Sequence, residues 1–93
     1  MSARDAASPT RTTDDPAARL RELDREVLDR HALGDRRALA PLYGEAGRIR
    51  EAEGLIDEAA FLYTQAYVYA LETGDTALSR EMHGRLKHHG RER

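Results

Sequence analysis

The sequence predicts an all-α protein whose four helices form two antiparallel hairpins. The chain has 93 residues, a length that allows one domain. Apolar residues recur every three or four positions, which is the period of an amphipathic helix. Two Gly-Asp pairs, at 34–35 and 74–75, together with Gly54, separate these periodic segments, because glycine ends helices and aspartate caps them. The signals place helices at about 16–33, 36–53, 55–73 and 75–89.

The first two helices are expected to be amphipathic. Asp15 is a good N-cap, and Pro16 fits the first turn, where a backbone donor is not needed. Charges of both signs surround the apolar stripe, so most of this first helix is expected to face solvent. In the second helix, Pro41 lies past the first turn, so either the helix kinks there or its regular part begins near Ala40. The apolar positions of the two helices are Leu20, Leu23, Val27, Leu28, Leu39, Leu42, Tyr43, Ala46 and Ile49.

The third helix is the most apolar part of the chain. Residues 59–71 read AAFLYTQAYVYAL, and they include four of the five aromatic residues of the protein. A helix that is apolar on all sides has to be covered on all sides. One face carries Ala59, Tyr63, Ala66, Tyr67 and Ala70. A second face carries Phe61, Leu62, Val68 and Tyr69, and two interpretations of it stay open: the centre of a small bundle, or a subunit interface.

The fourth helix has a narrow apolar stripe of Leu78, Met82 and Leu86. The last six residues of the chain, HHGRER, are polar and basic, and they are expected to fray.

The second and third helices resemble a tetratricopeptide repeat (TPR) over about residues 40–73. The family places a large residue and a small pair on one helix, a glycine at the turn, and a small–aromatic–small pattern on the next. Arg50 departs from the pattern, because the family usually has an aromatic residue there, and the terminal proline of the family is missing. A partial second copy starts 37 residues on, where residues 83–87 resemble residues 46–50. The matching positions are Tyr43, Ala46, Gly47, Gly54, Ala59, Tyr63 and Ala66.

The resemblance implies helices packed closely through small residues, with Tyr43 and Tyr63 filling the space between hairpins. It also implies a short groove lined by Gly44, Arg48 and Glu51. Repeat arrays generally need about three repeats for stability. So short an array is expected to dimerise or to dock on a larger protein.

Composition limits the function further. The chain has no cysteine, 15 basic and 17 acidic residues, and a net charge of −2, which argues against binding to nucleic acid or to an anionic membrane. No apolar run is long enough for a membrane span or a signal peptide, so a cytoplasmic location is expected. Arginine supplies 14 of the basic residues, which suggests a bacterial source. Residues 1–15 have almost no large apolar side chain and are expected to be a disordered tail, which leaves residues 16–93 as one helical domain.

No catalytic, metal or cofactor site is expected. The histidines, His31, His83, His88 and His89, lack the i, i+4 spacing of helical metal ligands, and no serine or glycine-rich loop has a suggestive setting.

The sequence therefore predicts a non-catalytic protein–protein interaction module, an accessory subunit or adaptor that binds another chain, different or identical, through residues 59–71. One alternative is a small subunit that contributes Tyr63, Tyr67 and His83 to the active site of an enzyme complex. Another alternative is a self-associating regulator that binds a small ligand.

Overall fold

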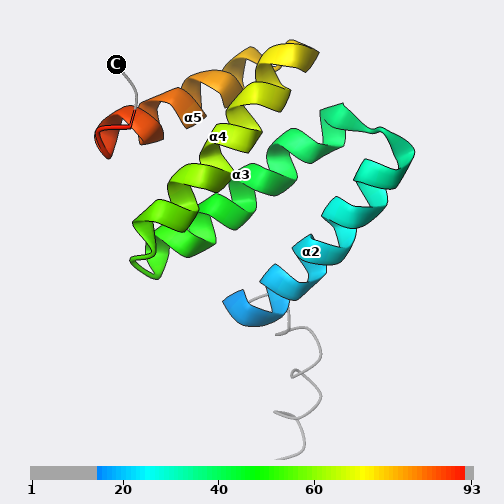
Figure 1. Cartoon of the computed structure of the whole chain (residues 1–93), viewed down its shortest axis with the longest axis horizontal. Helices are drawn as coiled ribbons and strands as arrows, with labels where there is room; N and C mark the ends of the chain where they lie inside the picture. The colour runs from blue at the N-terminus through cyan, green and yellow to red at the C-terminus, as the bar shows by residue number, and fades with distance from the viewer. Residues whose placement is uncertain (1–14, 92–93) are drawn as a thin grey trace, which may run out of the picture.

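The computed structural model describes residues 15–91 and contains four helices (Figure 1). No strand occurs among these residues, so the protein is all-α, as predicted. Every helix boundary lies within one residue of the range expected from the sequence. The expected disordered tail falls outside the described residues, except for Asp15. The helices are α2 (Pro16–Leu33), α3 (Arg36–Ala52), α4 (Ile56–Thr73) and α5 (Thr76–His88).

The two Gly-Asp pairs end one helix and begin the next. Gly34 and Gly74 have φ values of 69° and 77°, the left-handed conformation that ends a helix and that glycine adopts without steric penalty. Asp35 and Asp75 then accept hydrogen bonds from the backbone N–H groups of Ala38 and Leu78, both at 3.1 Å. The α2–α3 and α4–α5 turns are therefore built in the same way. In each, a glycine ends one helix and the aspartate that directly follows it caps the next helix.

Helix α3 begins at Arg36 and continues through Pro41. The alternative that its regular part begins near Ala40 is wrong. The Asp35 cap fixes the start of the helix upstream of the proline, so the hydrogen bond that Pro41 cannot donate is lost inside the helix.

The core lies where α4 packs between α3 and α5 (Figure 1). The inner face of α4 is mostly alanine, and these small side chains let its neighbours approach closely. Tyr63 is the largest completely buried side chain, and Met82 and Leu86 of α5 pack in the same cluster. Helix α2 packs mainly against α3, on the opposite side of the array from α5.

Within the described part of the chain, none of the helices combines the length and apolar content needed to cross a membrane.

Candidate functional site

Helix α4 is covered on one face only. Ala59, Tyr63, Ala66 and Ala70 are fully buried, and Tyr67 is partly buried, as expected for the inner face. On the outer face, Phe61 is 62% exposed, Val68 42% and Leu71 55%. Of the four residues predicted to form an interface, Phe61 and Val68 are thus open to solvent, and Leu62 and Tyr69 are partly buried.

A groove of about 430 Å³ lies beside Phe61, between α2 and α4, with α3 as its floor. Both α2 and α4 pack against α3, but their backbones do not approach each other closely. The apolar lining of the groove consists of Leu20, Ala46, Phe61 and Leu62. Its charged lining consists of Asp24, Arg50, Asp57 and Glu58. This groove was not predicted, because it depends on the angle at which α2 leaves α3.

Tyr69 has a role within the chain that the sequence did not reveal. Its ring stacks on that of Tyr43, with centroids 5.8 Å apart and planes 10° apart. His31 meets both rings edge-on, and its Nε2 lies 2.9 Å from the Tyr43 hydroxyl. Burial, followed by the nearby Tyr69, raises the pKa of Tyr43. Assigning Tyr69 to a partner interface is therefore incomplete, since its ring helps to join α2, α3 and α4.

Five of the seven residues of the predicted repeat pattern are buried. A Cβ placed on Gly47 would lie 2.6 Å from the ring of Tyr63, so only glycine fits against that ring. Ala46, Ala59 and Ala66 are buried, and Gly54 has a φ of 82° in the α3–α4 turn. Tyr43 is partly buried in the aromatic cluster. The starts of α3 and α5 lie 40 residues apart in the chain. The partial second copy of the repeat suggested by the sequence has a spacing of 37 residues.

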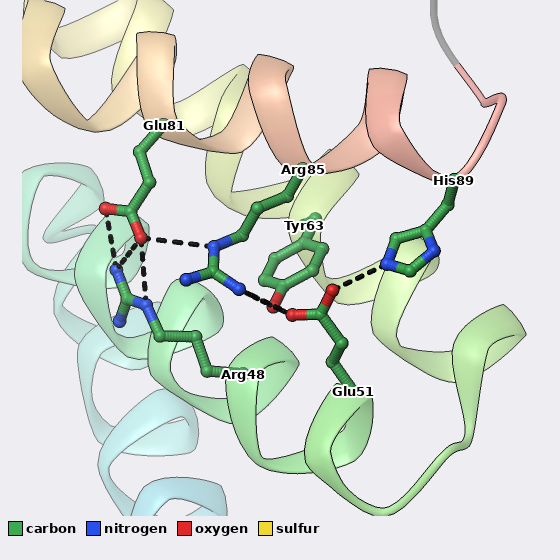
Figure 2. Close-up of polar contacts among 6 residues, drawn as sticks. All are labelled: Arg48, Glu51, Tyr63, Glu81, Arg85 and His89. Carbon is green, nitrogen blue, oxygen red and sulfur yellow. Dashed lines mark hydrogen bonds and ion pairs between the residues drawn. The ribbon is translucent and has the colours of Figure 1, made fainter.

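A polar network joins α3, α4 and α5 around Glu51 (Figure 2). The Tyr63 hydroxyl donates a 2.5 Å hydrogen bond to Glu51 Oε1, and Arg85 Nη1 donates another of 2.5 Å. His89 Nε2 lies 2.5 Å from Glu51 Oε2 and must carry the proton, because an ionised carboxylate only accepts. The Tyr63 hydrogen bond is the main cause that lowers the pKa of Glu51 to about 2, with further contributions from His89 and Arg85. Burial and the Glu51 contact raise the pKa of Tyr63 to about 12.

The network continues to Glu81, which links two arginines (Figure 2). Arg48 donates hydrogen bonds of 2.8–3.0 Å to both Glu81 oxygens, and Arg85 Nε lies 3.3 Å from Oε2. The remaining predicted groove residue, Gly44, is buried beneath Met82 and Leu78. The three predicted groove residues Gly44, Arg48 and Glu51 thus connect α3 to α5, and the two charged ones are already paired within the chain.

The two groups of this network with large pKa shifts, Glu51 and Tyr63, are poorly matched to acid–base chemistry at neutral pH. An efficient general acid or base has a pKa near the working pH, whereas the values of Glu51 and Tyr63 lie far from neutrality on opposite sides. Of the other groups considered for an active site, Tyr67 and His83 stack with centroids 5.8 Å apart. Within residues 15–91, no three His, Asp or Glu side chains are grouped so that they could hold a metal ion.

Sequence reasoning missed Glu81, Arg85 and His89. The expectation that the C-terminal residues fray is wrong for His89, whose side chain is largely buried against Glu51. The spacing of four between these three residues places them on one side of α5 and its C-cap, and this was the available signal.

Comparison of the chain with protein family models, with curated proteins and with solved structures gave no match.

Proposed function

We propose that this chain is a non-catalytic protein–protein interaction module, an accessory subunit or adaptor of a larger bacterial assembly in the cytoplasm, which binds its partner through α4. The observation that carries the proposal is the exposure of Phe61, Val68 and Leu71 on a helix whose opposite face lies in the core. Exposed apolar side chains that gather on one helix are typical of binding surfaces. The groove beside Phe61 adds a concave, partly apolar contact region.

The inner packing supports a scaffold role for the rest of the chain. Gly47 against Tyr63 matches the close helix contact that the tetratricopeptide-repeat resemblance implies. The Glu51 network ties three helices together at one carboxylate. A rigid support of this kind holds the exposed face of α4 in a fixed geometry, which lowers the entropic cost of binding.

The test is capture of the partner with matched variants. Tagged wild-type protein, Phe61→Arg and Leu28→Arg are purified mildly from the source cells, and the chains that co-purify are quantified by mass spectrometry. Leu28 is the control, because it is 69% exposed but lies on α2, outside the groove. We expect one partner chain to co-purify in a fixed ratio with the wild type and with Leu28→Arg. The amount of this partner that co-purifies with Phe61→Arg should be at least about tenfold lower.

Circular dichroism shows whether each variant remains helical, and light scattering gives the mass of each complex. A folded 10.4 kDa monomer with no α4-dependent partner would contradict the proposal. An increase in melting temperature with a small metabolite, in the absence of any partner chain, would favour the ligand-binding alternative.

A further inference from the structure

The groove between α2 and α4 is lined mainly by side chains. Its lining residues belong to three helices, and apart from Asp57 and Glu58 in the first turn of α4, their backbone N–H groups are engaged within those helices. A peptide that binds as an added strand needs free backbone groups in its receptor, whereas a helix satisfies its own backbone groups internally. The groove therefore fits the apolar stripe of a helix better than it fits a strand.

The charges around the groove are predominantly negative. The charged lining has three carboxylates, Asp24, Asp57 and Glu58, and one guanidinium, Arg50, so its net charge is −2. Arg50 already contacts Glu53 at 2.9 Å and Glu58 at 3.3 Å. Asp57 contacts Arg91 at 2.5 Å, but it is almost fully exposed. Asp24 has no charged partner within residues 15–91. The carboxylates of the rim can therefore still form ion pairs with basic side chains of a partner.

This charge argues against a second copy of the chain as the occupant. In a two-fold interface centred on the groove, each acidic rim would face the acidic rim of the other copy. Juxtaposed like charges disfavour such a complex. A partner that is complementary to the groove needs positive charge on both sides of an apolar stripe.

We infer that the groove between α2 and α4 binds an amphipathic helix of a different protein, with apolar residues at i, i+3, i+4 and i+7 and Lys or Arg on its flanks. The inference deepens the proposed function and rests on it. The apolar stripe would pack on Leu20, Leu62 and the exposed ring of Phe61. The basic flanks would meet Asp24 on the α2 wall, and Asp57 and Glu58 on the α4 wall.

The experiment uses two synthetic helical peptides of about 18 residues, long enough for a stable stripe once bound. Both carry the same leucine stripe and one tryptophan, and their flanking positions are Lys and Arg in one peptide and Glu in the other. The protein contains no tryptophan, so the peptide fluorescence reports binding directly. We expect the basic peptide to bind at least about tenfold more tightly than the acidic one, with an affinity that falls as salt is added.

Matched variants locate the binding site. Phe61 and Leu28 are exposed to similar extents, 62% and 69%, but only Phe61 lines the groove. We expect Phe61→Ser to weaken binding of the basic peptide about tenfold or more, Asp24→Asn to weaken it less, and Leu28→Ser to leave it unchanged. Absence of binding, equal affinity for the acidic peptide, or equal effects of the two serine variants would overturn the inference. A dimer that Phe61→Ser dissociates would also overturn it, in favour of a second copy.

The two failures can be told apart. Phe61-dependent capture of a partner, together with failure of both peptides to bind, would refute the helical, basic occupant and leave the interaction module intact. Capture that does not depend on α4 would refute the proposed function itself.

Discussion

Replacing Glu51 with glutamine should make stability depend less on pH. The pKa of Glu51 is about 2 in the folded chain and 4.5 when unperturbed. A difference of about 2.5 pH units, at ~1.4 kcal/mol each, corresponds to about 3–4 kcal/mol of stability at neutral pH. Because the folded pKa is the lower one, this contribution is complete above about pH 5 and is lost as the pH falls through 4.5 towards 2.

The assay is urea unfolding followed by circular dichroism at several pH values between 7 and 2.5. Glu51→Gln should be less stable than wild type by about 3–4 kcal/mol at pH 7, and this difference should fall below about 1 kcal/mol at pH 2.5. Glu72→Gln is the control, since Glu72 forms an exposed ion pair with Arg36 at 3.2 Å. Glu72→Gln should lower the free energy of unfolding by less than about 1 kcal/mol.

Carboxyl carbon NMR of the wild type gives a second measurement that does not depend on the variant folding. The Glu51 signal should titrate well below those of the exposed glutamates. Parallel stability curves for wild type and Glu51→Gln, or a Glu51 signal that titrates above pH 4, would refute the reasoning.

Three other predictions concern the core and its edges. Gly47→Ala should destabilise the protein by about 1–3 kcal/mol in urea unfolding, because its Cβ would meet the Tyr63 ring. Gly84→Ala, with nothing within 4 Å of its Cβ, should stabilise α5 by roughly 0.5–1 kcal/mol, and a loss of similar size in both variants would contradict this assignment. Because the pKa of Tyr63 is raised to about 12, its protonated hydroxyl stabilises the folded chain fully below about pH 10. This stabilisation is lost as the pH rises through 12. Tyr63→Phe should flatten this alkaline loss, as measured by thermal melts between pH 9 and 12. Tyr69→Ala should weaken the attachment of α2 by about 0.5–1.5 kcal/mol through loss of its edge-on contact with His31, and faster hydrogen exchange in α2 would show it.

The features that the sequence predicted well are local ones. Gly34, Asp35, Gly74 and Asp75 act within one turn of the chain, so their residue types were enough to place the helix ends. The close approach at Gly47 was also expected, because a small residue recurring at helical spacing marks the side where another helix packs.

The features that were missed depend on distant segments. Glu51 meets Arg85 and His89, which lie 34 and 38 residues further along the chain, and no local pattern fixes how α5 lies against α3. Tyr69 lies on the outer side of α4 by helical periodicity alone. The path of α2, which brings His31 to it, could not be predicted from spacing.

Helix α2 packs mainly against α3, whereas α4 packs against both α3 and α5. The two walls of the groove therefore differ in how firmly they are held. Helices α3, α4 and α5 share the buried core and the Glu51 carboxylate, so they should open as one cooperative unit. Helix α2 is held to α3 by Leu23, by the aromatic cluster and by Arg19, which forms a two-pronged 2.7–2.8 Å pair with Glu45. Local opening at α2 should therefore need less free energy than opening of the rest. Partners with side chains of different size would be accommodated by displacement of α2, while α4 acts as the fixed reference wall.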